Sequence, residues 1–172
     1  LWFALLAWLA FRFALLLAEG VLKPLYPWDA WIQWATKARV WYELRTIVPF
    51  ERVDAWFAAG GAAYFDASPN YPATVPLLMV WTNITLGQWD DALMNLPFWQ
   101  LAVGFCFAVY GVLRANGFGP AGALIGAWMV SSLPLATVHV ALAGYADLPM
   151  GAYFSLAALA GLRWVATREA GD

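Results

Sequence analysis

The pattern of hydrophobic and polar positions divides the chain into four long apolar runs and one long segment of mixed polarity. The apolar runs cover residues 1–18, 93–113, 118–140 and 148–165. Each approaches the ~20 apolar residues that a helix needs to cross a bilayer, and Pro134 is expected to kink the third. Arg12 interrupts the first run, and a charge inside a membrane is either functional or turned toward another helix or the surface. The pattern predicts an all-α polytopic membrane protein with about four transmembrane helices.

The segment of mixed polarity, residues 19–92, begins with a tryptophan-rich stretch of helical periodicity near 28–45. At 100° per residue, its polar and aromatic positions separate onto opposite faces. The polar face is expected to hold Asp29, Gln33, Thr36, Val40 and Glu43, and the opposite face Trp31, Trp34, Ala38, Trp41 and Tyr42. A helix of this kind is typical of a membrane surface, with its rings among the lipid head groups.

A second helical stretch covers residues 72–86, with prolines confined to its first turns and Gly87 at its end. Its length of ~22 Å is too short for a bilayer core of ~30 Å. We therefore interpret it as a juxtamembrane helix. The prediction is a single membrane domain over residues 1–172 with amphipathic juxtamembrane helices in a long first extracytoplasmic loop.

Composition supports the membrane assignment and excludes several kinds of site. The chain is 63% hydrophobic and 12% charged and contains 12 tryptophans, whereas soluble domains carry about 25% charged residues. The net charge of −2 gives no support for nucleic-acid binding. A lone cysteine and a lone histidine provide neither a disulfide nor a cysteine- or histidine-based metal cluster. We expect an integral membrane protein with membrane lipids as partners and no nucleic acid.

Asp29 is the first candidate for chemistry, because it lies in the first turn of the tryptophan-rich helix. A carboxylate held at a bilayer surface is suited to act as a general base toward an acceptor hydroxyl. The alternative is that Asp29 caps the helix, since aspartate is favoured at that position. The two roles are compatible.

Lys37 and Arg39 are candidates for binding lipid phosphate, because cations at a membrane surface attract phosphate groups. Solvated loop charges are the alternative. Asp147, at the start of the last apolar run, is either a second acid that joins Asp29 or a helix cap. His139 is either a substrate contact or a packed side chain.

Chain parity links the two aspartates. With four spans, Asp29 and Asp147 lie on one side of the membrane, whereas Arg114, Arg163 and Arg168 lie on the other. Arginines beside short loops favour the cytoplasmic face. The long segment also carries basic residues, which the same rule would place inside, but its acidic residues indicate a loop that folds on its own. The aspartates are therefore expected to face outward.

The order of several short motifs resembles a known family. The motifs lie at residues 27–31, 34–38, 70–72, 75–78 and 144–149. Together with the first apolar run, they resemble the N-terminal part of the GT-C superfamily of membrane glycosyltransferases. The nearest resemblance is to bacterial members related to the protein mannosyltransferase and aminoarabinose transferase group. The chain, which begins at Leu1 inside an apolar run, is accordingly expected to be a fragment of a longer protein.

The resemblance implies specific roles for the candidate residues. Asp29 would be the catalytic aspartate of the first outer loop, which orients or deprotonates the acceptor hydroxyl, and Asp147 the second acidic residue, in the next outer loop. Substrate or lipid-phosphate contacts would come from Lys37, Arg39, Tyr71, Tyr145 and His139. No cofactor is expected, and a divalent metal, which some relatives use, has no ligand cluster in the sequence.

The predicted function is transfer of a sugar from a polyprenyl-phosphate-linked donor to an unknown acceptor hydroxyl, with inversion at the anomeric centre. The reaction would take place at the outer face of a bacterial inner membrane. Two alternatives from other classes stay open. The same aromatic and basic surface would suit a transporter or flippase-like protein that binds an isoprenoid lipid without reacting, or a non-catalytic membrane scaffold.

Overall fold

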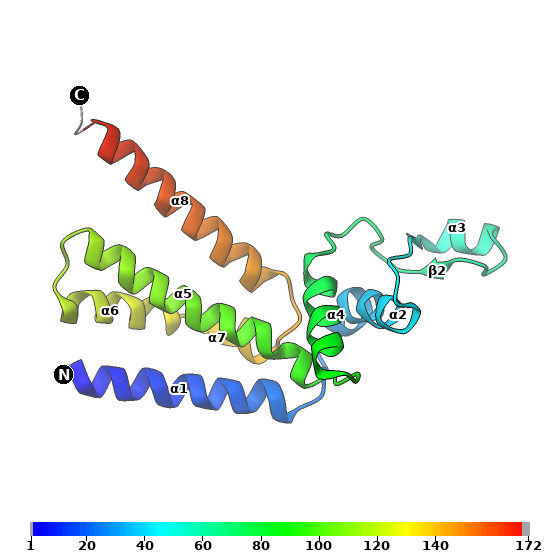
Figure 1. Cartoon of the computed structure of the whole chain (residues 1–172), viewed down its shortest axis with the longest axis horizontal. Helices are drawn as coiled ribbons and strands as arrows, with labels where there is room; N and C mark the ends of the chain where they lie inside the picture. Colours follow the sequence, from blue (N-terminus) through cyan, green and yellow to red (C-terminus); the bar gives the residue numbers. More distant parts are fainter. Residues whose placement is uncertain (1, 170–172) are drawn as a thin grey trace. The chain divides into compact units, whose positions relative to one another are not determined.

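The computed structural model describes residues 2–169 and is mainly α-helical (Figure 1). The helices are α1 (Trp2–Leu22), the π-helix Ala30–Ala35, α2 (Thr36–Leu44), α3 (Val53–Ala58), α4 (Thr74–Leu86), the 3₁₀-helix Leu93–Asn95, α5 (Leu96–Ala115), α6 (Pro120–Ser131), α7 (Pro134–Ala141) and α8 (Asp147–Glu169). Two short strands, β1 (Phe50–Glu51) and β2 (Tyr64–Phe65), pair in parallel. The predicted helical fold class is confirmed, and the strand pair was not predicted.

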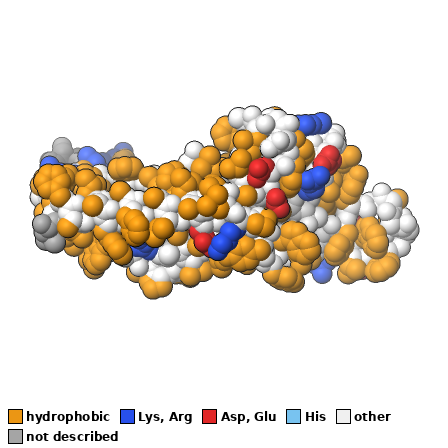
Figure 2. All heavy atoms as spheres, turned by 90° about the horizontal axis from the view of Figure 1, so that it is seen from below, with side chains coloured by type: hydrophobic (Ala, Val, Ile, Leu, Met, Phe, Trp, Pro, Cys, Tyr) orange, Lys and Arg blue, Asp and Glu red, His pale blue; other side chains and the backbone are white. Residues whose placement is uncertain are grey.

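The chain divides into two compact units, which are described separately. The first unit consists of Leu1–Leu17, Phe98–Ala141 and Ala146–Asp172. The second consists of Ala18–Pro97 and Leu142–Tyr145. On the face drawn in Figure 2, apolar side chains cover most of the first unit, whereas charged side chains gather over the second unit.

Helices of the first unit are held together by apolar contacts. Leu9 of α1 is buried in one cluster with Cys106 and Val109 of α5 and with Leu124 and Ala127 of α6. Burial of side chains of this size stabilises a fold by about 1.5–3 kcal/mol each in water, but lipid tails are as apolar as leucine. Close packing would therefore have to hold these helices together in a membrane.

Two helices of the described residues are long and apolar enough to cross a bilayer: Trp2–Leu22 and Leu93–Ala115. A third span is possible if α6 and α7 count as one, although they are bent by 62° at their break. The predicted kink at Pro134 is thus confirmed. The last predicted run, residues 148–165, lies within α8, which is not among the helices that are apolar enough to cross a bilayer. The prediction of about four spans is therefore not confirmed.

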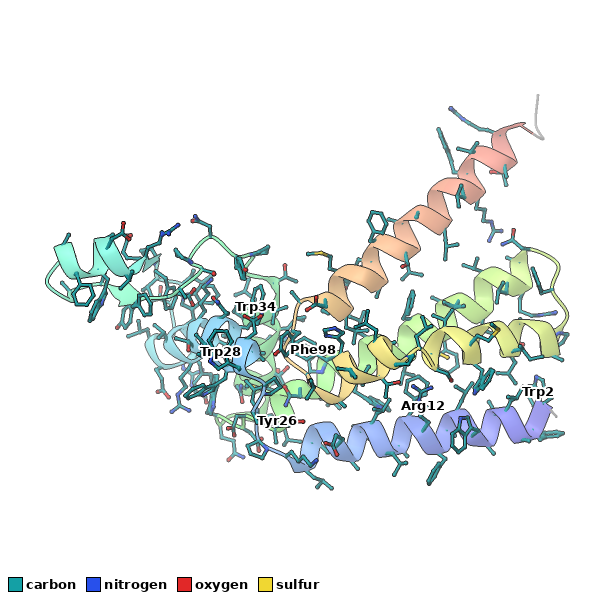
Figure 3. All side chains as sticks on the ribbon, turned by 180° about the vertical axis from the view of Figure 1, so that it is seen from behind. Trp2, Arg12, Tyr26, Trp28, Trp34 and Phe98 are labelled. Atoms are coloured by element: carbon teal, nitrogen blue, oxygen red, sulfur yellow. The ribbon has the colours of Figure 1, made fainter. Side chains whose placement is uncertain are left out.

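Arg12 lies at the break between α6 and α7 (Figure 3). Its guanidinium donates hydrogen bonds to Ser132 Oγ at 2.7 Å and to Thr137 Oγ1. The two hydroxyls flank the break. Arg12 therefore has protein partners in the first unit, as the interpretation of a charge turned toward another helix predicts.

In the second unit, the tryptophan-rich helix contains a π-turn. The helix begins with the hydrogen bond from Trp31 N to Pro27 O, continues as a π-helix over Ala30–Ala35 and becomes α2. Thr36 Oγ1 donates to Trp31 O at 3.1 Å, which satisfies one carbonyl of this widened turn. A π-turn changes the angular register of the residues that precede it, and such turns are frequent at functional sites.

The predicted division of this helix into polar and aromatic faces is wrong. The buried face contains Gln33 and Lys37 as well as Trp34 and Trp41, whereas Trp31 is exposed. One physical reason is the π-turn, which breaks the 100° period on which the prediction rests. The other is that a partner carboxylate in the second unit, described below, allows a lysine to be buried.

Candidate functional site

Asp29 lies in the second unit, where the helix has already begun. Its backbone is helical, with φ −67° and ψ −40°, and its carboxylate makes no capping hydrogen bond. Its side chain is half-buried, between Trp28, which is exposed, and Ala30, which is fully buried. The capping alternative is therefore not what the structure shows, and the carboxylate is not used to satisfy the helix end.

The loop Leu142–Tyr145 packs against the same turn. Gly144 has φ +95°, and a Cβ built there would meet Ala30 Cβ at 2.8 Å, Leu25 Cδ1 at 3.1 Å and Met79 Cε at 3.2 Å. Only glycine fits such a close approach without strain. The segment that carries Tyr145 thus lies beside the residue that follows Asp29, within the second unit.

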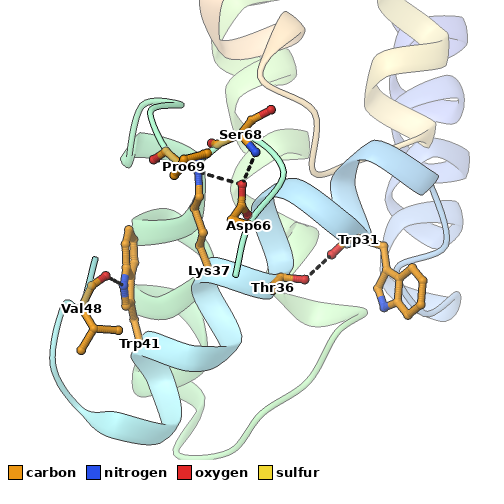
Figure 4. A network of polar contacts seen from close by, with 8 residues as sticks. All are labelled: Trp31, Thr36, Lys37, Trp41, Val48, Asp66, Ser68 and Pro69. Carbon is orange, nitrogen blue, oxygen red and sulfur yellow. Dashed lines mark hydrogen bonds and ion pairs between the residues drawn. The ribbon is translucent and has the colours of Figure 1, made fainter. Parts of the chain in front are cut away.

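Lys37 of α2 contacts the loop at residues 66–69, which lies far along the chain (Figure 4). Its Nζ lies 3.6 Å from Asp66 Oδ1 and donates to Ser68 O at 2.6 Å. Asp66 Oδ1 accepts in turn from Ser68 N at 2.6 Å, and Pro69 O lies 3.4 Å from the ammonium. Lys37 and Asp66 are each 1% exposed. The pair holds the loop that leads to α4 against the helix.

Burial lowers the pKa of Lys37 below its ordinary value of 10.5, and the Asp66 carboxylate opposes part of this change. In the described conformation, the ammonium is enclosed by protein oxygens. From the sequence, Lys37 was expected either to bind a lipid phosphate or to be a solvated loop charge, but the structure buries it in the core of the second unit.

Tyr71 is brought to the same cluster. Its ring stacks on Trp34, with centroids 5.2 Å apart, and the Lys37 ammonium lies 5.8 Å from its centroid. Of the predicted contact residues, Lys37 and Tyr71 are thus neighbours. Tyr71 is 47% exposed, so part of this residue reaches the surface beside the buried ion pair.

Arg39 lines an open groove of about 400 Å³ in the second unit. The groove residues that carry polar or aromatic groups are Trp31, Thr36, Arg39, Trp89 and Asp91. The Arg39 guanidinium lies 4.8 Å from the Trp89 ring centroid, and its Nη2 is 2.6 Å from Glu43 Oε1. Arg39 is therefore oriented before any ligand binds, and its side chain is 50% exposed.

Asp91 is a functional candidate that the sequence did not reveal. The neighbouring Asp90 caps a helix, because its Oδ1 accepts from Ala92 N at 3.0 Å and Leu93 N at 2.8 Å, while Asn83 Oδ1 accepts from Asp90 N at 2.6 Å. Asp91 instead lines the groove. The only sign of this role in the sequence is that two carboxylates are adjacent, although a helix needs only one of them as a cap.

His139 and Asp147 are neighbours in the first unit. His139 Nδ1 lies 3.9 Å from Asp147 Oδ2, and the two side chains are 20% and 62% exposed. Asp147 is in the first turn of α8, where a negative charge stabilises the helix dipole. Asp29 belongs to the second unit and Asp147 to the first.

Among residues 2–169, no group of three or more His, Cys, Asp or Glu side chains is arranged to hold a metal ion. No protein-family model matches the chain, and neither a curated protein nor a solved structure matches it. The functional interpretation therefore depends on the geometry of the sites and on the resemblance of the motifs.

Proposed function

We propose that the protein takes part in the transfer of a sugar from a polyprenyl-phosphate-linked donor to an acceptor hydroxyl at the outer surface of a bacterial inner membrane. The observation that carries the proposal is the environment of Asp29. This carboxylate is half-buried, is not used as a helix cap, and lies in a helix that follows the membrane-capable α1. A carboxylate in this position is suited to general-base catalysis at a bilayer surface.

In the proposed reaction, Asp29 accepts the proton of the acceptor hydroxyl. The acceptor oxygen forms a bond to the anomeric carbon of the donor sugar, and the bond between that carbon and the phosphate oxygen breaks. The polyprenyl phosphate leaves with the bonding electrons, and the anomeric configuration is inverted. We assign Asp147 as a second acid on the same side of the membrane.

The path of the chain supports this assignment of sides. The chain leaves the second unit after Pro97, passes through α5, α6 and α7, and returns to the second unit at Leu142. If α5 crosses the bilayer, a return to the side of Asp29 requires α6 and α7 to cross as one broken span. The residues just before Asp147 then lie on the side of Asp29.

The cations have unequal access to the donor. Lys37 is enclosed by its loop partners, whereas half of the Arg39 side chain is exposed. We therefore propose that Arg39 contacts the donor phosphate, and that Lys37 supports the site by holding the 66–71 loop. Guanidinium groups bind phosphate through paired hydrogen bonds, which a flexible ammonium does not reproduce.

The test is an Asp29→Asn exchange in native membranes, with Asp54→Asn as a matched control. Asp54 is an exposed aspartate in the first turn of α3. We expect Asp29→Asn to lower the transfer rate by about 10²–10⁴-fold, the usual contribution of a general base, with little change in donor binding. Transfer at the wild-type rate in the Asp29 variant would refute the catalytic role.

A transporter for an isoprenoid lipid is the second candidate, and one observation favours it. The first unit has an apolar cavity of about 550 Å³ lined by α1, α5 and α6, including Leu9, Phe13 and Val103. An isoprenoid chain would fit apolar walls of this kind. Lipid translocation without sugar transfer, unchanged by Asp29→Asn, would favour this alternative.

A further inference from the structure

We propose that the groove in the second unit is a pyranose-binding subsite, in which the sugar ring stacks on Trp31 and its hydroxyls bind Asp91 and Arg39. This inference rests on the proposed function in one respect, namely that the bound sugar belongs to the lipid-linked donor. Binding of a pyranose in the groove is argued from the groove residues alone.

The walls of the groove fit the apolar face of a sugar ring. Trp31 lines the groove and is 62% exposed, so the protein leaves most of this residue uncovered. Val40, which is half-buried, and Leu25 provide apolar surface around it, and Met94 lies fully buried behind them. The negative face of an aromatic ring attracts the polarised C–H groups that a pyranose presents on its flat side. The volume of about 400 Å³ lies within the usual range of small-molecule sites.

The polar groups of the groove match hydroxyls better than they match phosphate. A hydroxyl both donates and accepts, and the groove offers a guanidinium donor at Arg39 together with acceptors at Asp91 and Thr36. A phosphate only accepts. Arg39 is already paired with Glu43, so Asp91 gives the groove an excess of negative charge that repels an anion. The ring therefore belongs inside the groove and the donor phosphate at the exposed edge of Arg39.

Contacts within the protein orient Arg39, Trp89 and the turn of Asp91 before a ligand binds. The Trp89 ring contacts the Arg39 guanidinium, 4.8 Å from its centroid, and the Tyr42 ring, whose centroid is 5.4 Å away. The turn that carries Asp91 is held by Asn83, which is fully buried, and by the Asp90 cap. Side chains that are ordered in advance lose little entropy on binding, which favours a specific site.

The test uses saturation-transfer NMR and calorimetry on the intact chain in nanodiscs, because sugar-based detergents would compete for the groove. The probes are methyl β-D-glucopyranoside and methyl α-D-mannopyranoside. Acyclic sorbitol and inorganic phosphate serve as ligand controls. We expect saturable binding of at least one pyranoside and weaker binding of sorbitol, which lacks a flat apolar face, and of phosphate.

Two variants assign the binding to the groove. Trp31→Ala should weaken pyranoside binding about 10-fold, which corresponds to ~1.4 kcal/mol. The matched control is Trp81→Ala on α4, since Trp81 is 63% exposed and does not line the groove. Asp91→Asn, which preserves shape, should weaken binding about 3–10-fold through loss of the charged acceptor.

Equal effects of Trp31→Ala and Trp81→Ala would overturn the proposal, and so would sorbitol or phosphate binding as well as a pyranoside. Absence of any pyranoside binding would do the same. These outcomes are distinct from failure of the proposed function, which is measured as transfer by the Asp29 variant. A groove that binds pyranosides in a protein that does not transfer sugar would identify a carbohydrate-binding protein.

Discussion

Arg12 in the first unit, which is half-buried, and Lys37 in the second, which is buried, are both basic side chains with partners inside the protein, but those partners differ. Arg12 donates to the neutral hydroxyls of Ser132 and Thr137. Lys37 faces the carboxylate of Asp66, which is 1% exposed. The comparison shows that the loss of stability on removing such a cation depends on whether its former partner is neutral or charged. A hydroxyl can bond to its own helix, whereas the Asp66 carboxylate would keep an uncompensated charge even though Ser68 N still donates to it.

The largest effect is expected for Lys37→Met. This change leaves the Asp66 carboxylate buried without its countercharge, which costs about 3–5 kcal/mol. We expect a lower unfolding temperature and faster amide hydrogen exchange over residues 66–71. Lys23→Met is the control, because the Lys23 side chain is 53% exposed and its pair with Glu19 contributes little.

A double exchange of Lys37→Met and Asp66→Leu sharpens this prediction. Replacement of both partners by apolar side chains removes the orphaned charge, so the double variant should be more stable than Lys37→Met alone. Equal instability of the two variants would mean that packing, and not charge, accounts for the loss.

The next effect compares two glycines that are close to other side chains. Gly144→Ala in the second unit combines a φ of +95° with a Cβ only 2.8 Å from Ala30 Cβ, and should cost about 1–3 kcal/mol. Gly126→Ala in the first unit meets chiefly the flexible end of Leu113 in an α-helix, and should be much milder. Thermal unfolding in nanodiscs measures both. A larger loss for Gly126→Ala would contradict the assignment of tight packing to the 142–145 loop.

The smallest effect is expected for Arg12→Met. An arginine in the middle of a membrane helix costs about 2.5–3.5 kcal/mol, whereas hydrogen bonds between membrane helices contribute about 0.6 kcal/mol each on average. Thr137 Oγ1 already donates to Leu133 O at 3.2 Å, so it keeps a partner. Removal of the charge outweighs the loss of the two hydrogen bonds by about 1–2 kcal/mol, so we expect Arg12→Met to leave the stability unchanged or to raise it by up to that amount. Destabilisation as large as that of Lys37→Met would break the comparison between the two cations.

The helices could be predicted from the sequence because their signals are local. Apolar runs indicated the regions of α1 and α5, Pro134 indicated the bend between α6 and α7, and Gly87 indicated the end of α4. Gly87 indeed ends that helix, in a left-handed conformation. Each of these features depends on residues that are neighbours in sequence.

The core of the second unit could not be predicted in the same way. The partners of Lys37 lie far along the chain, with Ser68 31 residues away. Periodicity assigns a lysine to the polar face unless its partner is known. The groove was missed for a related reason, since it combines Trp31 and Arg39 with Trp89 and Asp91, and no local pattern joins these segments. Asp29 was identified from its local setting, but its role as a base stays a prediction.

The π-turn over Ala30–Ala35 has a consequence for how this protein can be varied. If the same residues formed a regular α-helix, Asp29 would be rotated by about 100° around the axis relative to Lys37. Removal of one residue within the turn, such as Ile32, would instead restore the regular helix and keep the angle between Asp29 and Lys37. The direction of the Asp29 carboxylate is therefore encoded by the extra residue of the π-turn, and a single-residue deletion should be tolerated better within this turn than elsewhere in the helix.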